Sequence, residues 1–466
     1  MGVFFDGKSI LKPGAYSRVD ASGMLSAGVS SGKTPLFIGS SDDGLPQQIM
    51  YFASPADAKA VLSGGDLLRA LEIAWSPSTS VPGAGVVACI RVNNATQATH
   101  TFADAVKITA LGYNTKDYEF KVVVDDGDVY ITLTDGTITE IIEAENTSAA
   151  IVAAINENSQ LVVAETTGTG LGVLTASVGF VAFATAGTSP AATSSDWENC
   201  IDKAEFADIQ ALIPVTADET VHAYVKDHVL RLSDVVNRKE RRMFVGHASN
   251  ETIDQILTRV VNLGTHRALL ASPGIKKVVN GVVVDLSPVF TACALAGMWA
   301  GTPHEHPLTY DYINCLGLTK IYTNAEINML IKGGVTVVES VPGKGYRVVL
   351  ATTTYLMDGN IMFKELSVST LVDIMSRELR EFLEAKFIGK VDTTVLTSAK
   401  NATETKLNAF VREGWLVEGA DQNTGEVLPP FRNIEVRKVG TALYINWEGS
   451  PITPNNYVLI TSYFTL

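Results

Sequence analysis

Residues 206–272 decide the fold, with the sequence FADIQALIPVTADETVHAYVKDHVLRLSDVVNRKERRMFVGHASNETIDQILTRVVNLGTHRALLAS. Three short apolar runs, at 209–213, 243–245 and 268–270, alternate with longer segments of helical periodicity. Short buried strands that alternate with amphipathic helices are typical of a parallel sheet with helical crossovers. The stretch therefore predicts an α/β layer with helices on the faces of its sheet.

The helices of this α/β part carry start and stop signals. The first is expected at 220–237, and the second is expected to begin after the cap Asn250 and to end at Gly264. A third is expected at 288–300, and Thr323 with Glu326 forms the capping box of a fourth. The region therefore supplies several strand–helix units in succession.

Residues 93–195 have a different pattern. Two β-branched runs, 120–124 and 129–133, flank the turn Asp-Asp-Gly-Asp, which predicts a hairpin. A helix is expected at 148–156, and the most apolar stretch, 171–186, is interpreted as a buried hairpin because it is too short to span a membrane. This segment is predicted to be an inserted, mainly β domain.

Beyond residue 360 the pattern is α+β. Thr370 and Asp373 resemble the start of a long amphipathic helix that ends at Gly389, and a second helix is expected at 403–412. Three strand-like runs follow, at 434–439, 442–447 and 457–464. The expected fold class is multidomain α/β and α+β: an N-terminal arm and loop (1–35), an α/β domain (36–92 plus 196–360), the inserted domain (93–195) and a C-terminal α+β domain (361–466) that ends in a strand arm.

Composition and charge limit the classes of function. The 466 residues include 46 % hydrophobic and 18 % charged residues, which favours several folded domains. A net charge of −14 repels phosphate backbones and anionic lipids, so we expect neither nucleic acid nor a membrane as a partner. The start MGVFFDGKSI lacks the pattern of a signal peptide, which predicts synthesis without export by that route.

Several motifs suggest chemistry but lack its structural context. Residues 28–34, GVSSGKT, resemble a phosphate-binding loop, but one residue fewer separates their two glycines, and the segment leads into a strand. The same stretch is not preceded by a strand and followed by a helix, as a nucleophile elbow must be. His304 and His306 stand in a proline-bounded loop, and His222 and His228 lack metal-ligand spacing. Four cysteines without CxxC spacing are expected to be buried free thiols. We predict no catalytic, cofactor-binding or metal site, no cofactor and no enzymatic activity.

The two ends of the chain point to assembly. Residues 10–19 alternate polar and apolar side chains ahead of a Gly/Ser-rich loop, and 457–464 form a strongly β-prone strand close to the last residue. An uncovered strand of this kind promotes aggregation, so we expect it to pair with a neighbouring subunit. The predicted intersubunit arm residues are Pro13, Gly14, Ala15, Tyr16, Val19, Tyr457, Val458, Leu459, Ile460 and Tyr463. Their acceptor is expected to be the sheet formed by 434–439 and 442–447.

Four motifs together resemble the contractile phage tail sheath proteins: Pro-Gly-Ala-Tyr ending at Tyr16, Gly-Met-Trp-Ala-Gly-Thr-Pro at 297–303, Arg-Glu-Leu-Arg at 377–380, and Asn-Ala-Phe-Val-Arg-Glu-Gly at 408–414. The resemblance implies a subunit that forms hexameric rings stacked in a helix around a tail tube, with terminal arms linking neighbours. Contraction of a metastable packing then drives the tube through a cell envelope without nucleotide hydrolysis.

The resemblance also implies partners and a location. The partners are other copies of the chain, the tail tube protein, and baseplate and tail terminator proteins; the location is the virion tail, assembled in the cytoplasm of the host bacterium. It further implies that a charged helix faces the tube, which makes Arg377, Arg380 and Lys386 candidates for that contact, although a solvated helix face is an equal alternative. Two other functions stay open on the residues alone: an α/β enzyme acting on a small molecule, and a surface or adhesin-like structural protein.

Overall fold

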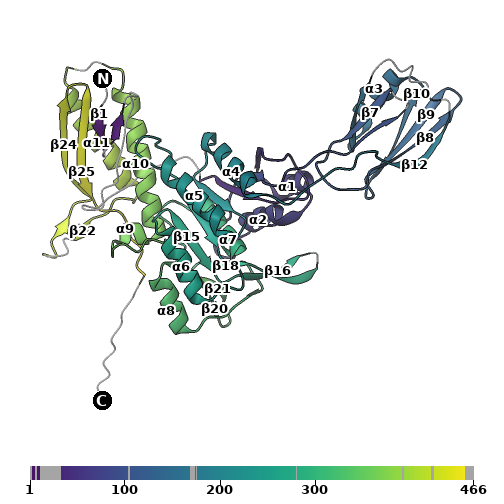
Figure 1. Cartoon of the computed structure of the whole chain (residues 1–466). Helices are drawn as coiled ribbons and strands as arrows, with labels where there is room; N and C mark the ends of the chain where they lie inside the picture. Colours follow the sequence, from purple (N-terminus) through teal and green to yellow (C-terminus); the bar gives the residue numbers. More distant parts are fainter. Residues whose placement is uncertain are drawn as a thin grey trace. The chain divides into compact units, whose positions relative to one another are not determined.

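The computed structural model describes residues 3–5, 8–10, 33–102, 105–167, 174, 176–279, 281–390, 393–420 and 424–456. The chain divides into two compact units (Figure 1). The first consists of 1–37, 70–88 and 204–466, and the second consists of 38–69 and 89–203. Strands β3 (Pro35–Gly39) and β5 (Val87–Arg91) begin in the first unit and end in the second. None of the helices described is both long and apolar enough to cross a bilayer.

A parallel sheet forms the centre of the first unit. Its parallel strands are β13 (Ala211–Pro214), β14 (Arg242–Gly246), β15 (Ala268–Ser272) and β20 (Val335–Val341). The antiparallel strands β21 (Gly345–Leu350) and β18 (Tyr312–Ile313) extend it beyond β20. Every residue of β13, β14 and β15 is buried, which explains why their sequences are continuous apolar runs without alternation. The predicted α/β layer is confirmed.

Helices cover this sheet. They are α5 (Glu219–Leu232), α6 (Ile253–Leu263), α7 (Pro288–Gly301) and α8 (Asn324–Lys332). Helix α7 lies against β14 and β15, and α5 lies against β13 and β14. The capping box of Thr323 and Glu326 and the left-handed Gly264 (φ 50°) occur as predicted. The cap of α6 was predicted wrongly: Thr252 caps the helix in place of Asn250, because its hydroxyl and the side chain of Gln255 satisfy each other's backbone N–H groups.

The C-terminal part of the first unit contains two long helices, α10 (Leu366–Phe387) and α11 (Val395–Arg412). Helix α10 begins four residues before the predicted start at Thr370. The Thr370 hydroxyl donates to the carbonyl oxygen of Leu366, 2.8 Å away, so it bonds inside the helix and caps nothing. Helix α11 begins at Val395, well before the predicted 403. The local polar signals were misleading because packing extends both helices toward their N-termini.

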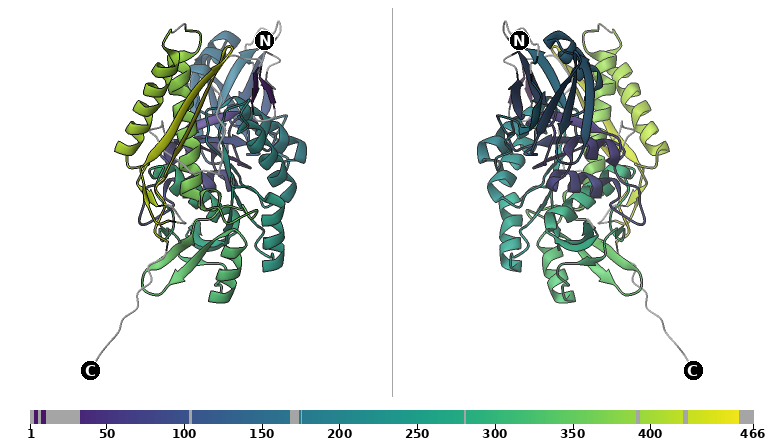
Figure 2. Two further views of the ribbon diagram at one scale, coloured as in Figure 1. Left: turned by 90° about the vertical axis from the view of Figure 1, so that its left-hand side faces the viewer. Right: turned by 90° about the vertical axis from the view of Figure 1, so that its right-hand side faces the viewer.

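A β-hairpin follows the helices and lies along α11 (Figure 2). Its strands are β24 (Phe431–Val439) and β25 (Ala442–Gly449), which pair antiparallel as a two-stranded sheet around Gly440 (φ 60°). The predicted strands 434–439 and 442–447 are thereby confirmed. Near the amino end, β1 (Val3–Phe5) and β2 (Lys8–Ile10) form a second short antiparallel pair.

The second unit is mainly β and has its own apolar core. Its two sheets contain β8 (Glu119–Asp125), β9 (Asp128–Thr134), β10 (Thr139–Glu145) and β12 (Val178–Ala182), and β6 (Thr99–Phe102), β7 (Val106–Ala110) and β11 (Val162–Thr166). The predicted hairpin turns at Asp126 (φ 38°) and Gly127 (φ 96°), and the helix appears as α3 (Ser148–Asn158). The buried hairpin predicted at 171–186 is wrong: β12 is an exposed strand that pairs with β8.

The remaining elements complete the description. They are β4 (Ile49–Phe52), α1 (Pro55–Leu62), α2 (Gly65–Trp75), α4 (Ser194–Lys203), a 3-10 turn (Ala204–Phe206), β16 (Ile275–Val279), β17 (Val282–Leu286), β19 (Gly317–Leu318), α9 (Ile361–Lys364), β22 (Gly419–Ala420) and β23 (Val427–Leu428). Several sheets, both parallel and antiparallel, therefore share one chain with long helices. The predicted multidomain α/β and α+β fold class is confirmed.

Candidate functional site

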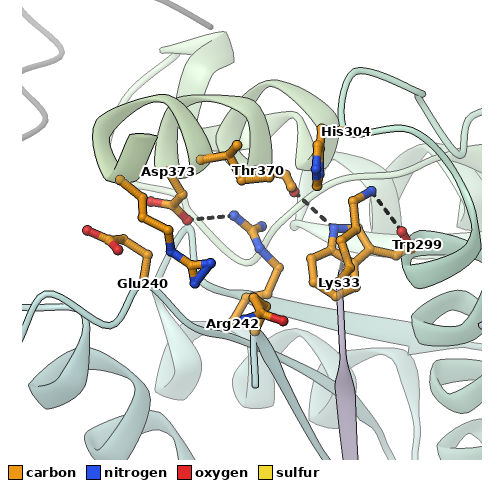
Figure 3. A pocket seen from close by; sticks show the side chains of 10 residues that line it. Lys33, Glu240, Arg242, Trp299, His304, Thr370 and Asp373 are labelled. Atoms are coloured by element: carbon orange, nitrogen blue, oxygen red, sulfur yellow. Dashed lines mark hydrogen bonds and ion pairs between the residues drawn. The ribbon is translucent and has the colours of Figure 1, made fainter. Parts of the chain in front are cut away.

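The main polar cluster of the first unit, here called the polar junction, lies where the start of β3, the end of α7, strands β14 and β15 and the first turns of α10 meet (Figure 3). Its central residues are Lys33, Arg242, Arg267, Trp299, Thr370 and Asp373. These side chains come from segments far apart in the sequence. The junction therefore ties the long helix α10 and the segment before β3 to the central sheet.

Lys33 fixes the segment that leads into β3. Its Nζ donates to three carbonyl oxygens at the end of α7, those of Trp299 (2.8 Å), Thr302 (3.0 Å) and Pro303 (3.0 Å). Three acceptors match the three N–H donors of an ammonium group. Burial, with the positive charge of Arg242 adding to it, lowers the pKa of Lys33 to about 7. This lysine, which belongs to the loop-like motif 28–34, thus bonds inward to the protein backbone.

Asp373 is buried between two arginines. Its Oδ2 accepts from Arg242 Nη2 and from Arg267 Nη1, each at 2.8 Å, and its Oδ1 accepts from Arg267 Nη2 at 2.9 Å. Burial alone raises the pKa of Asp373, but the charges of Arg267 and Arg242 outweigh this effect and hold the pKa below its ordinary value. The carboxylate is therefore charged in the folded state and links α10 to β14 and to the residue that precedes β15.

The motif at 297–303 forms the opposite wall of the junction. A Cβ atom on Gly297 would lie 2.4 Å from the carbonyl oxygen of Ala74, and one on Gly301 would lie 2.3 Å from that of Gly83. Trp299 Nε1 donates to the Thr370 hydroxyl at 3.2 Å, and Thr302 and Pro303 supply carbonyl oxygens to Lys33. Glycines at these two positions allow backbone to approach backbone, so the motif has a structural explanation.

The buried side chain of Glu365 binds a residue near the C-terminal end of the chain, Asn456. Glu365 precedes α10 and is 3 % exposed. Asn456 Nδ2 donates to its Oε2 at 3.3 Å, and the Ser367 hydroxyl donates to its Oε1 at 3.4 Å. Burial raises the pKa of Glu365 to about 7, and the two hydrogen bonds oppose this shift only in part. Asn456 is the last residue before the part of the C-terminal end that lies outside the described residues.

We predict that the pH dependence of stability contains a component from Glu365. Between pH 4.5 and about 7 the folded state binds the proton more tightly than the unfolded state, so this component is present at low pH and is lost as pH rises through 7. At pH 8 the Glu365→Gln variant should exceed the natural chain in stability by roughly 3 kcal/mol or less, and the difference should vanish near pH 4. Urea unfolding at both pH values measures it. A pH-independent difference contradicts the assignment.

The predicted tube-facing residues lie in different environments on α10. Arg380 is buried, and its Nη1 and Nη2 donate to the carboxylate of Glu240 at 2.6 and 2.9 Å. Lys386 is exposed, with its Nζ 5.3 Å from the ring centroid of Phe382. Arg377 is half-buried and lines the polar junction. The three side chains therefore do not form one exposed face.

None of the predicted intersubunit arm residues falls within the part of the chain that the structure describes. Pro13, Gly14, Ala15, Tyr16, Val19, Tyr457, Val458, Leu459, Ile460 and Tyr463 lie outside the described residues. Their pairing with the hairpin of β24 and β25 stays a prediction.

Histidines and cysteines occupy ordinary structural positions. His222 is buried and lies 2.9 Å from the carbonyl oxygen of Thr216, and His228 lies 3.0 Å from Arg241 Nη1. His306 Nε2 lies 2.7 Å from Asp311, so the loop is closed by an ion pair or hydrogen bond. All four cysteines are free, and three of them are buried. No group of three or more His, Cys, Asp or Glu side chains within the described ranges is placed to hold a metal ion.

Sequence reasoning missed the polar junction, although four of its six central residues, Lys33, Trp299, Thr370 and Asp373, lie in motifs that it singled out. Asp373 was interpreted as a helix start and Lys33 as part of a failed phosphate loop. One available signal was Arg241-Arg242 at the start of a strand whose next residues, Met-Phe-Val, are apolar. A charged residue at the edge of a buried run needs a partner of opposite charge. The sequence could thus have predicted that an arginine here forms a buried ion pair, but not which acidic residue is its partner.

Comparisons with known proteins show what the chain is similar to. Residues 191–354 match the phage tail sheath protein central domain. The tail sheath protein of Bacillus phage SP01 is 27 % identical, and the match covers 99 % of this chain and 97 % of that protein. A putative tail sheath protein of Enterococcus phage phiEF24C is 24 % identical over 87 % of this chain and 90 % of that protein.

Solved structures give the same result for the fold. The sheath tail protein from Desulfitobacterium hafniense superposes with a TM-score of 0.65 at 15 % identity, covering 94 % of this chain and 93 % of that chain. The contracted helical sheath of the anti-feeding prophage gives a TM-score of 0.58 at 13 % identity, covering 97 % and 98 %. The predicted resemblance is confirmed: the chain has the fold of the tail sheath proteins, and residues 191–354 match the model of the phage tail sheath protein central domain.

Proposed function

We propose that the chain is a structural subunit of a contractile tail sheath, which polymerises as stacked hexameric rings around a tail tube and contracts to drive the tube through a cell envelope. The observation that carries the proposal is the extent of the match. It covers nearly the whole of a phage tail sheath protein and nearly the whole of a subunit from a contracted helical sheath. The chain therefore aligns with nearly the whole length of both proteins.

The proposed mechanism is mechanical. The central sheet, helices and polar junction of the first unit stay intact while contacts between subunits change. The extended sheath is a metastable packing, and formation of new lateral interfaces supplies the free energy of contraction. Residues 10–19 and 457–464 act as strands donated to neighbouring copies, with β24 and β25 as their acceptor. The four-part division into arm, α/β domain, inserted domain and C-terminal domain serves these roles.

Partners and location follow from the same proposal. The subunit contacts other copies of itself, the tail tube protein, and baseplate and tail terminator proteins in a virion tail assembled in the host cytoplasm. It needs no cofactor and catalyses no reaction. Arg377, Arg380 and Lys386 stay the candidates for the contact with the tube. Because Arg380 is buried and neutralised by Glu240, we propose that the exposed Lys386 contributes most of the charge at this contact.

Electron microscopy of the purified chain tests the proposal. We expect negatively stained samples to contain hollow tubes or stacks of rings. Deletion of residues 457–466 should abolish tube formation while the remaining chain stays folded, as judged by circular dichroism and thermal unfolding. The control Asp126→Asn alters the exposed hairpin turn of the second unit and should leave tubes unchanged, since asparagine tolerates the positive φ there. A monodisperse monomer at high concentration overturns the assembly role, and normal tubes from the deletion variant overturn the arm role.

A further inference from the structure

The polar junction contains a small cavity. Its volume is about 20 Å³, and its lining includes Lys33, Glu240, Arg242, Asp373 and Arg377. Roughly 10–15 Å³ measured in this way holds one water molecule, so the space admits a single particle of that size or slightly larger. Figure 3 shows the guanidinium group of Arg242 between Asp373 and the indole of Trp299.

The charges around this cavity do not balance. Both lining carboxylates are already engaged from outside it: Asp373 by Arg267, at 2.8 and 2.9 Å, and Glu240 by Arg380, at 2.6 and 2.9 Å. Two guanidinium groups remain at the lining, that of Arg242, which shares Asp373 with Arg267, and that of Arg377; the amino group of Lys33, with its pKa lowered to about 7, lies beside them. Within the described part of the chain, no carboxylate forms an ion pair with Arg377. The cavity therefore lies in a positive potential.

Arg242 supplies an independent observation. Its Nη2 donates to Asp373, but its Nη1 is completely buried and has no hydrogen-bond partner among the described residues. An unsatisfied buried donor costs roughly 1–3 kcal/mol, and more when it is charged. Such a donor on the wall of a cavity is expected to bond to whatever fills the cavity.

We propose that the polar junction binds one monovalent inorganic anion of about the size of chloride, which accepts a hydrogen bond from Arg242 Nη1 and is further stabilised by the charges of Arg377 and Lys33. A water molecule satisfies the donor but leaves the positive charge unbalanced, whereas an anion does both. The bound anion is a further link between β14, α10 and the segment before β3, in addition to the hydrogen bonds already described. This role is separate from assembly, because it concerns the folded subunit alone.

Binding of this kind makes stability depend on the identity of the anion. A ligand that binds only the folded state raises its stability as the ligand concentration increases above the dissociation constant. General screening of surface charges depends only on ionic strength. We therefore expect the full-length chain to have a higher Tm in sodium chloride than in sodium gluconate at equal ionic strength, because gluconate is too large for the cavity.

Two variants separate the site from general salt effects. Arg377→Gln removes a lining charge from a half-buried position, and the chloride-dependent increment of Tm should be lost or strongly reduced. Arg412→Gln makes the same change of charge at an exposed position at the end of α11 and should keep the full increment. Equal increments in the natural chain and both variants overturn the proposal.

Crystallography locates the particle directly. Crystals grown with bromide in place of chloride should show an anomalous peak in the cavity, within hydrogen-bond distance of Arg242 Nη1. Because the peak depends only on the subunit, it should appear whether or not the chain forms tubes. Density without anomalous signal at a saturating bromide concentration identifies a water molecule and overturns the proposal.

Discussion

Replacement of Asp373 by asparagine is expected to destabilise the first unit by roughly 3–5 kcal/mol, the usual cost of removing one partner from a buried ion pair. The variant keeps the shape of the side chain but leaves Arg242 and Arg267 buried without a countercharge. Urea unfolding followed by tryptophan fluorescence measures the effect, since Trp299 lies in the same junction.

A matched carboxylate provides the control for this prediction. Asp285 forms an ion pair with Lys276 at 3.0 Å, and both side chains are exposed. Asp285→Asn should cost less than about 1 kcal/mol, as exposed pairs usually do. If the two substitutions lower the stability by similar amounts, the ion pairs of Asp373 are no stronger than an exposed pair. That result contradicts the assignment of Asp373 to a buried ion pair.

Replacement of Gly297 by alanine is expected to destabilise the chain by about 3 kcal/mol, the upper range for overpacking. In an unconstrained helix the same change stabilises by roughly 1 kcal/mol, because alanine has the higher helix propensity. Here the new Cβ lies 2.4 Å from the carbonyl oxygen and 2.6 Å from the Cα of Ala74, both backbone atoms. Helix α7 or the end of α2 must shift to make room.

The control for this substitution is Gly85→Ala, because nothing lies within 4 Å of a Cβ at that position. Thermal unfolding of the two variants should show a large loss for the helix position and a small change for the loop position. Unchanged stability of Gly297→Ala is the result that rejects close backbone packing of α7.

Local and periodic features of the sequence predicted much of the fold. The buried runs of β13, β14 and β15 and the hairpin of β24 and β25 have the expected strands. Errors occurred where a polar side chain has a distant partner. Asp373 resembles an N-terminal helix residue, but its partners are 106 and 131 residues away, and nothing in the local pattern identifies them.

The resemblance to sheath proteins predicted the family but left its residues unexplained. The motif at 297–303 could be recognised as a sequence pattern, but tertiary contacts with Ala74, Gly83 and Lys33 explain why these residue types occur there. The environment of Arg380, one of the candidate tube-facing residues, was not predicted from the sequence. Arg380 follows the charged pattern of an exposed helix face, yet the structure buries it against Glu240, because the distribution of charge along a helix does not reveal which side another element covers.

The attachments of Lys33 and Asn456 also determine how the subunit responds to tension on its two ends. A pull transmitted through residue 33 is shared by three hydrogen bonds to the end of α7, and bonds loaded together must break together. A pull transmitted through Asn456 meets one side-chain hydrogen bond of 3.3 Å to Glu365, and only then the backbone bond from Ile452 N to Trp415 O. The attachment at residue 33 therefore resists tension more strongly. The attachment at the carboxyl end gives way first, because its hydrogen bonds break one after another.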